Sequence, residues 1–146
     1  MPCEFKYTKR VEFYETDLAG IMHFSNFFRY MEIAEHAFVR SLGFSIHQEF
    51  DGVKTGWPRV HVECDFFKPL QYEDEVEIHL QVAEKKQKAL SYKFTFRKLT
   101  DGTPRETIAV GRSTAVCVGF NQQGKIAGAI PIPAALADRI QQAPPE

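Results

Sequence analysis

Asp17 is the residue of this 146-residue chain whose surroundings best suit a chemical reaction. It lies in an irregular segment, YETDLAGIMHF (residues 14–24), just before a segment that we expect to be helical. The first N–H groups of a helix lack intrahelical acceptors, so they can bind an oxyanion that develops at a carbonyl. A carboxylate beside them can attack that carbonyl or activate a water. An isolated Asp at such a place is more often a turn or helix cap, and both interpretations stay open here.

Histidine, serine and cysteine patterns give weaker candidates. His23 is close to Asp17 in sequence and could border the same pocket, whereas no histidine pair has a metal-binding spacing such as H-E-x-x-H. No serine lies in a G-x-S-x-G motif, which argues against a serine-triad hydrolase. The cysteines, Cys3, Cys64 and Cys117, form no C-x-x-C motif, so neither a disulfide framework nor a metal site is expected.

Two groups of charged residues allow both a structural and a functional interpretation. Lys85, Lys86 and Lys88 lie in the sequence EKKQK between two expected strands, where they either solubilise a hairpin or receive phosphates as point charges. No glycine-rich phosphate-binding motif accompanies them. Glu32 and Glu35 lie in the expected helix, and such charges usually face solvent. A helix wrapped by a sheet could instead direct one of them into a pocket or a dimer interface.

A long helix and several strands must position these residues. Apolar side chains at i, i+3, i+4 spacing predict a helix over residues 25–43, capped by Ser25 or Asn26 and stopped at Gly43. After Pro58 the apolar period changes to two, which predicts strands. The strands expected from such alternation are residues 4–13, 59–66, 76–82, 90–96 and 106–119.

The remaining segments complete the expected architecture. Residues 44–58 form a connection in which the capping-box spacing of Ser45 and Gln48 predicts a short helix. One face of the strand at 106–119 carries only small residues, so we expect the long helix to pack closely against it. Pro133 can open a short C-terminal helix. The order β-α-β-β-β-β plus a terminal helix predicts an α+β fold, with an antiparallel sheet wrapped around one long central helix.

Composition sets outer bounds on function. The length fits one domain over residues 1–146, and 44% hydrophobic residues supply a core. Eighteen basic and 19 acidic residues give a net charge of -1, which excludes binding of nucleic acid by bulk charge. No apolar run approaches the roughly 20 residues of a membrane span. The N-terminus lacks a signal-peptide core, so we expect a cytoplasmic protein.

Taken together, residues 11–43, VEFYETDLAGIMHFSNFFRYMEIAEHAFVRSLG, resemble the opening motif of hotdog-fold acyl-CoA thioesterases. The resemblance is greatest to the 4-hydroxybenzoyl-CoA thioesterase group, with its YbgC-like and dihydroxynaphthoyl-CoA thioesterase relatives. Residues 64–78 and 112–133 are similar to later parts of the same family, so most of the chain is covered. The positions that match the opening motif are Phe13, Asp17, Gly20, Ile21, Met22, Asn26 and Phe27.

The resemblance implies a site and an assembly. Asp17 matches the catalytic carboxylate, and a backbone N–H near His23 and Phe24 matches the oxyanion donor. The substrate is an acyl-CoA, and no further cofactor is implied, because CoA is part of the substrate. Family members form homodimers through a sheet edge, commonly assembled into homotetramers, with the pocket between subunits. The residues that match CoA-phosphate contacts are Lys86 and Lys88, with Lys85.

The reaction that we expect is hydrolysis of a thioester to a carboxylic acid and free CoA. Asp17 acts either as the nucleophile or as a general base, and the sequence leaves both routes open. We expect an apolar acyl pocket bordered by Trp57, Pro58 and His61, for an aromatic or an aliphatic acyl group.

One departure from the family's pattern and one alternative function also follow from the comparison with this family. Relatives often read Glu-Ala-Arg after the helical Glu32, where this chain has an acid, Glu35, in place of the arginine. The same fold also supports a non-catalytic protein that binds acyl-CoA or an acyl carrier, which is the alternative function. A hotdog hydratase is disfavoured, because the motif does not match its pattern.

Overall fold

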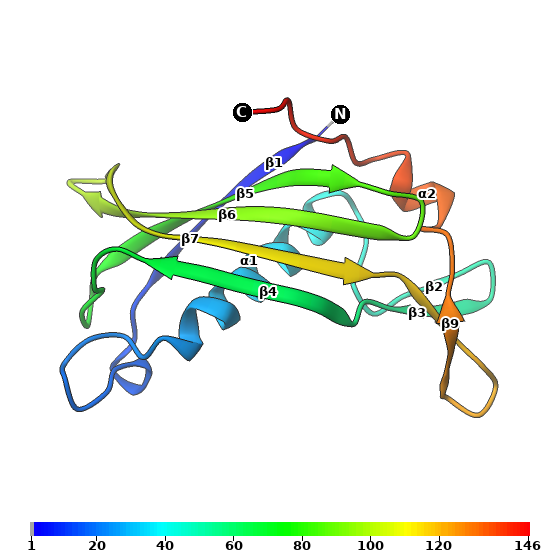
Figure 1. The fold of residues 1–146 in the computed structure, drawn as a ribbon, viewed down its shortest axis with the longest axis horizontal. Helices are drawn as coiled ribbons and strands as arrows, with labels where there is room; N and C mark the ends of the chain where they lie inside the picture. The colour runs from blue at the N-terminus through cyan, green and yellow to red at the C-terminus, as the bar shows by residue number, and fades with distance from the viewer. Residues whose placement is uncertain (1) are drawn as a thin grey trace.

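A five-stranded antiparallel sheet and one long helix make up most of the computed structural model, which describes residues 2–146 (Figure 1). The large sheet has the strand order β1-β5-β6-β7-β4, and a small sheet has the order β2-β3-β8-β9. The elements are β1 Glu4–Arg10, the 3-10 helix η1 Phe13–Glu15, α1 Ser25–Ser41, β2 Glu49–Phe50, β3 Val53–Gly56, β4 Arg59–Phe66, β5 Glu75–Lys85, β6 Ala89–Thr100, β7 Thr103–Val116, β8 Val118–Phe120, β9 Ile126–Ala129 and α2 Ala134–Ala137. The predicted α+β architecture is therefore confirmed.

The ends of the sheet carry different segments. In Figure 1 the loop that precedes α1 lies at one end, and the turn between β5 and β6 lies at the other end, beside α2. α1 runs along one face of the sheet between these ends. Any group on the β5–β6 turn is thus separated from Asp17 by the length of the sheet.

The apolar stripe of α1 forms the centre of the core. Tyr30, Ala34 and Phe38 are fully buried, and Phe27 and Met31 are nearly so. They pack against alternating inward side chains of β5, β6 and β7. Burial of apolar surface at about 25 cal/mol per Å² is the main stabilising contribution here.

The start of α1 differs from the expected cap. The predicted caps Ser25 and Asn26 are both inside the helix, and Phe24 takes the cap position without a side-chain hydrogen bond. Asn26 instead donates its side-chain amide to the carbonyl of Glu15, at 2.9 Å. The predicted stop is confirmed, since α1 ends at Ser41 and Gly43 adopts a left-handed φ of 92°.

The predicted short helix in residues 44–58 is wrong. This segment contains the two-stranded hairpin of β2 and β3. The capping contacts still form, because the Ser45 N–H donates to Gln48 Oε1 at 2.9 Å. The Ser45 hydroxyl accepts from His47 N–H instead of Gln48 N–H, so half of the capping box closes a turn here without a helix following it.

The strand expected over residues 106–119 is divided at Cys117. The Cys117 N–H donates to the carbonyl of Lys88 at 2.7 Å, and the Cys117 carbonyl accepts from Ile130 N–H at 2.9 Å. β7 therefore ends in the large sheet, and β8 continues in the small one. The C-terminal helix opened by Pro133 is confirmed as the single turn α2.

The small-residue face of β7 lies beneath α1, as predicted. A Cβ placed on Gly111 would lie 2.7 Å from Met31 Sδ and 3.4 Å from the backbone oxygen of Glu63. Glycine is therefore what allows the helix to approach β7 at this point.

We expect Gly111→Ala to lower the free energy of unfolding. The overlap with Met31 outweighs the smaller unfolded-state entropy of alanine, for a net loss of about 1 kcal/mol. Gly119→Ala is the matched control, because its Cβ would meet only ordinary contacts, the nearest at 3.4 Å. Urea denaturation of both variants measures the difference, and equal stabilities would contradict close packing at Gly111.

A buried ion pair joins α1 to the edge strand β4. Glu35 is 1% exposed, and its Oε2 accepts a hydrogen bond from Arg59. Arg59 also lies 3.8 Å from a carboxylate oxygen of Glu32. Burial is the largest influence on Glu35, and Glu32 adds to it, so the pKa of Glu35 rises to about 7 although Arg59 opposes the rise.

The raised pKa predicts a stability change with pH. The folded Glu35 keeps its proton at a pH where the unfolded chain has lost it, so this contribution is complete below about pH 4.5 and is lost as the pH rises through about 7. Wild type should lose up to roughly 3 kcal/mol relative to Glu35→Gln between pH 5 and pH 8. The comparison cancels His36, whose pKa is lowered by burial. Denaturation curves across this range measure the effect, and parallel profiles would contradict it.

Candidate active site

The loop that carries Asp17 is tied to the start of α1 by the backbone of Glu15. The carbonyl of Glu15 accepts hydrogen bonds from His23 N–H and from the Asn26 side chain, both at 2.9 Å. Met22 N–H donates to the carbonyl of Leu70 at 2.7 Å, which fixes the end of the loop to the β4–β5 connection. The two ends of the loop are therefore held in place.

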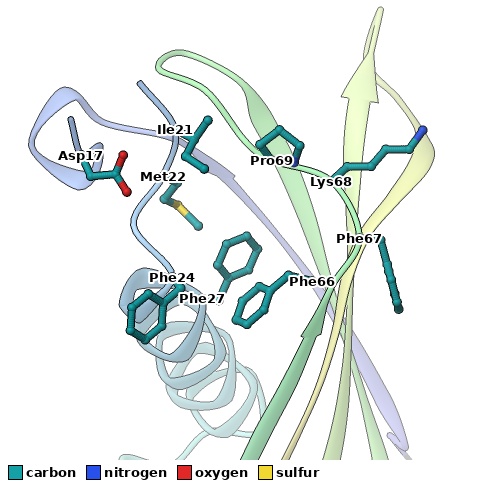
Figure 2. Close-up of a pocket in the computed structure, with 9 residues that line it drawn as sticks. All are labelled: Asp17, Ile21, Met22, Phe24, Phe27, Phe66, Phe67, Lys68 and Pro69. Atoms are coloured by element: carbon teal, nitrogen blue, oxygen red, sulfur yellow. The ribbon is translucent and has the colours of Figure 1, made fainter. Parts of the chain in front are cut away.

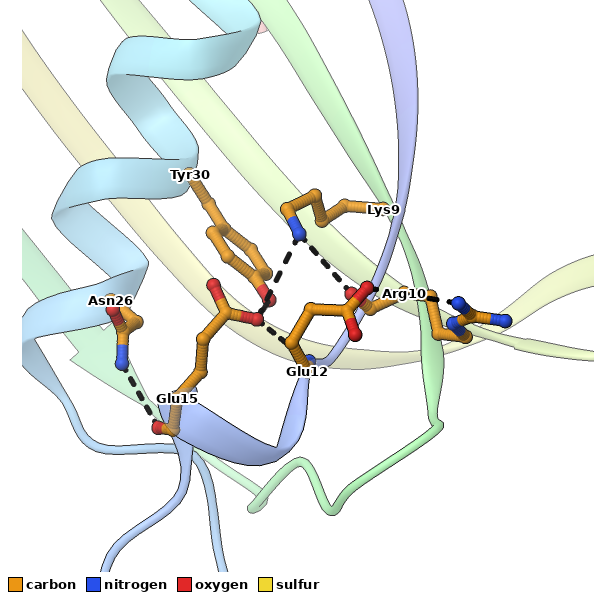
Figure 3. A network of polar contacts seen from close by, with 6 residues as sticks. All are labelled: Lys9, Arg10, Glu12, Glu15, Asn26 and Tyr30. Carbon is orange, nitrogen blue, oxygen red and sulfur yellow. Dashed lines mark hydrogen bonds and ion pairs between the residues drawn. The ribbon is translucent and has the colours of Figure 1, made fainter.

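The Glu15 side chain anchors the same loop from inside (Figure 3). It is 5% exposed, and its Oε1 accepts from Tyr30 Oη at 2.6 Å and from Glu12 N–H at 2.7 Å. Lys9 Nζ lies 3.8 Å away and balances part of the charge. Burial, together with this carboxylate, raises the pKa of Tyr30, so the phenol stays a hydrogen-bond donor. A buried carboxylate with these partners is a structural anchor.

Asp17 itself occupies a turn. Its Oδ1 accepts a hydrogen bond from Ala19 N–H at 2.9 Å, its own N–H donates to the Ile21 carbonyl, and Gly20 supplies a left-handed φ of 79°. The turn interpretation of Asp17 is thus right as far as Oδ1 is concerned. Within residues 2–146, Oδ2 has no hydrogen bond, so one oxygen is available for chemistry.

A pocket of about 450 Å³ opens beside Asp17 (Figure 2). Its walls are mainly apolar, with a carboxylate and an ammonium as the charged groups. The Asp17 carboxylate points from its loop toward this space. The lining residues are Asp17, Ile21, Met22, Phe24, Phe27, Phe66, Phe67, Lys68 and Pro69.

Sequence reasoning did not assign Phe66 and Phe67 to the pocket. The sequence did contain a signal, because adjacent side chains at the end of a strand point to opposite faces. At least one of these two aromatic rings therefore had to lie outside the core. Both are exposed, by 47% and 59%. Lys68 at the rim was also missed, and its Nζ lies 2.8 Å from Glu106 Oε1.

The two backbone amides expected to bind an oxyanion have different environments. His23 N–H is already donated to the Glu15 carbonyl. Phe24 N–H forms no hydrogen bond within the described part of the chain. Ser25 N–H donates to His23 Nδ1 at 3.3 Å, and Ser25 Oγ lies 2.8 Å from the same ring nitrogen. Of these two amides, the Phe24 N–H is therefore the one that can donate to a new acceptor.

The lysine group is not brought to Asp17 within one chain. It occupies the β5–β6 turn, at the far end of the sheet (Figure 1). Lys85 Nζ donates to the carbonyls of Ala137 and Ile140, at 2.7 and 2.8 Å, so it ties down the C-terminal segment. Lys86 and Lys88 are exposed, and Lys86 lies 3.5 Å from Glu84.

Trp57, Pro58 and His61 also lie away from the Asp17 pocket. They are at the beginning of β4, whereas the pocket is formed at its end, by Phe66. Trp57 packs against the core, and His61 is exposed with Nε2 3.4 Å from Glu63. A pocket bordered by these residues together with Asp17 does not form within one chain.

Among residues 2–146 there is no cluster of His, Cys, Asp or Glu side chains that could hold a metal ion. In the same part of the chain, no helix combines the length and the apolar character needed to cross a bilayer.

Known proteins place this fold in a family. A model of the thioesterase-like superfamily matches residues 11–140. A putative esterase of Aquifex aeolicus is 40% identical over 124 residues, covering 84% of this chain and 88% of that protein. A 1,4-dihydroxy-2-naphthoyl-CoA hydrolase of Prochlorococcus marinus is 31% identical over 105 residues, covering 66% and 68%. A solved gentisyl-coenzyme A thioesterase is 33% identical with a TM-score of 0.76, covering 90% of this chain and 98% of that one. The chain thus belongs to the thioesterase-like superfamily and has the hotdog fold of its acyl-CoA thioesterases.

Proposed function

We propose that this protein hydrolyses an acyl-CoA to a carboxylic acid and free CoA, with Asp17 as the catalytic carboxylate. The observation that carries the proposal is that Asp17 lines an apolar pocket together with Phe24, the cap residue of α1, whose N–H has no acceptor within residues 2–146. A thioester carbonyl between them would meet a carboxylate on one side and a hydrogen-bond donor on the other. The membership of the family supports this reaction.

Two routes lead to the same products. In the first, Asp17 attacks the carbonyl carbon, the C–S bond breaks to release CoA thiolate, and water then hydrolyses the mixed anhydride. In the second, Asp17 takes a proton from a water that attacks the carbonyl directly, and the thiolate leaves with that proton. In both, the Phe24 N–H stabilises the negative charge on the carbonyl oxygen. The unpaired Oδ2 of Asp17 serves either route.

The acyl group that we propose is aromatic. The pocket walls include Phe24, Phe27 and Phe66, which suit stacking with a ring. Two relatives point the same way, because their names specify gentisyl-coenzyme A and 1,4-dihydroxy-2-naphthoyl-CoA. We therefore propose a hydroxylated aromatic acyl-CoA as substrate, acted on in the cytoplasm.

We propose that two copies pair along β4 and that such homodimers assemble into homotetramers. β4 is an edge of the large sheet and bears apolar side chains that are open to solvent in the single chain. An unpaired, apolar edge favours association with another strand. The exposed side chains on and just after β4 are Val60, Val62, Phe66 and Phe67.

Contacts with the CoA phosphates then come from another copy. Lys86 and Lys88 are exposed and distant from Asp17 within one chain, so only a neighbouring subunit could bring them to the same substrate. Lys85 is excluded from our proposal, because its ammonium is already shared by two carbonyls.

Asp17→Asn tests the proposed chemistry. Asn keeps the size and the turn hydrogen bond but removes the carboxylate, so kcat/KM for aromatic acyl-CoAs should fall about 100-fold or more. Thiol release from short, long and aromatic acyl-CoAs measures it. Asp51→Asn is the control, since Asp51 is an exposed turn residue with a φ of 51° that Asn tolerates.

Equal turnover by wild type and Asp17→Asn would contradict the assignment and direct attention to another carboxylate. Tight binding of acyl-CoA with no turnover in either protein would instead favour the non-catalytic alternative.

Val60→Glu tests pairing along β4. Val60 is 64% exposed, so the substitution leaves the core of the chain intact while placing a charge on the proposed interface. We expect a shift from the oligomer toward the monomer in analytical ultracentrifugation. Val53→Glu, at a valine that is 42% exposed on β3, should leave the assembly unchanged. An unaltered mass for Val60→Glu would contradict pairing at this edge.

A further inference from the structure

A second cavity lies along the same helix and edge strand as the Asp17 pocket. Its volume is about 270 Å³. The Asp17 pocket uses the first turn of α1 and the end of β4, whereas this cavity uses later turns of α1 and the earlier part of β4. The lining residues are Phe28, Arg29, Met31, Glu32, Glu35, Arg59, Val62 and Ser113.

Ser113 gives this cavity an unfilled hydrogen-bonding position. Its side chain is 2% exposed, and Oγ has no hydrogen-bond partner among residues 2–146. On the opposite face of the same strand, Thr114 Oγ1 is paired with Ser91 Oγ at 2.8 Å. The unpaired hydroxyl of this pair of neighbours is therefore the one on the cavity side. A buried hydroxyl without a partner is costly and uncommon, and a ligand group that pairs with it removes the cost.

The charges in the cavity lining are balanced, because two guanidiniums, Arg29 and Arg59, stand with two carboxylates, Glu32 and Glu35. The Arg59 guanidinium is already shared by the carboxylates of Glu35 and Glu32 and by the carbonyl of Trp57, at 3.2 Å. An ionised ligand of either sign would therefore meet a like charge in this lining. A neutral hydroxyl, in contrast, can donate to Glu35 and accept from Ser113 Oγ.

The size and walls select a ring. A cavity of about 150 Å³ lined by apolar side chains suffices for benzene, so the present volume holds one substituted aromatic ring. Phe28, Met31 and Val62 supply apolar walls, and Met31 offers a sulfur for contact with a ring edge. Apolar walls with few convergent polar groups are the usual composition of a site for a small organic group.

We propose that this cavity is the recognition site for a hydroxyl group on the aromatic ring of the substrate. Ser113 and Glu35 bind the hydroxyl, and Arg59 is a positioning residue that holds Glu35. This inference rests on the proposed thioesterase function in assigning the ring to an acyl group, whereas the affinity of the cavity for a hydroxylated ring can be tested without any turnover.

Pairing along β4 would bring the cavity to the reacting carbonyl. Within one chain, Phe27 and Glu35 are eight residues apart on α1, about 12 Å along the helix axis. Antiparallel pairing of two β4 strands about a two-fold axis sets the Arg59 end of one copy beside the Phe66 end of the other. The ring would then reach the cavity of one copy while its thioester lies at Asp17 of the other.

The first test compares ring substituents. The preference is the ratio of kcat/KM for the 2-, 3- and 4-hydroxybenzoyl-CoAs to that for benzoyl-CoA. Ser113→Ala should lower the highest of these ratios about 3- to 10-fold, the range expected for one lost hydrogen bond. Ser113→Ala should fold, because it removes an unpaired buried hydroxyl. Thr114→Ala, the neighbour on the opposite face, is the control and should leave the ratio unchanged. An unchanged ratio in Ser113→Ala would overturn the proposal.

The second test needs no catalysis. Titration of the wild-type protein with phenol, followed by NMR, should give saturable shifts at Ser113 and Glu35. Toluene, with a methyl group in place of the hydroxyl, should bind more weakly, and Ser113→Ala should remove the difference. Equal binding of phenol and toluene would overturn the proposal even if acyl-CoAs are hydrolysed. Preferential binding of phenol would support it even if no acyl-CoA is hydrolysed, in which case only the proposed function fails.

Discussion

The attachment of the loop before α1 to that helix is the constraint on which the site depends. Glu15 holds the loop through its carbonyl, which accepts from His23 and Asn26, and through its carboxylate, which accepts from Tyr30. Asp17 is two residues further along, so its position follows from this anchor. Preorganisation of this kind matters because a reacting group that is already in place need not be ordered during the reaction.

The same anchor determines which amide is free. A helix start offers several N–H groups, and here their acceptors are mostly supplied by the chain itself. The Glu15 carbonyl takes the N–H of His23, and the His23 ring takes that of Ser25, which leaves Phe24 beside the pocket. Of the N–H groups of His23, Phe24 and Ser25, only that of Phe24 is thus left without an acceptor among residues 2–146.

The sequence predicted the central features because they depend on local pattern. The long helix follows from its apolar spacing, and the close approach at Gly111 follows from the small face of β7. Asp17 was singled out because a carboxylate before a helix start is visible in the chain order; it lies in a turn beside a pocket, and its catalytic role stays a prediction. The family resemblance strengthened that interpretation, and the family itself is confirmed.

The features that sequence reasoning missed depend on contacts between distant segments. Lys85 reads as a free surface charge, yet its ammonium binds the carbonyls of Ala137 and Ile140, more than 50 residues away. For Glu35 the sequence left both a solvated face and a pocket open, and the contact with β4 decides between them, because Arg59 covers the carboxylate. The direction of β4 likewise decides which of its ends meets Asp17, and periodicity alone does not fix that direction.

β4 links the proposed assembly to the proposed specificity. An exposed apolar edge is normally a hazard for a soluble fold, because it invites indiscriminate pairing. Here one end of the edge borders the Asp17 pocket with Phe66, and the other borders the second cavity with Arg59. Pairing of two such edges would cover the apolar strand. It would also bring the Asp17 pocket of one copy, proposed for catalysis, next to the second cavity of the other copy, proposed for binding the ring hydroxyl. Selection for substrate discrimination would then also maintain the interface. In a single chain, one cavity contains Asp17 and the other contains Ser113 and Glu35.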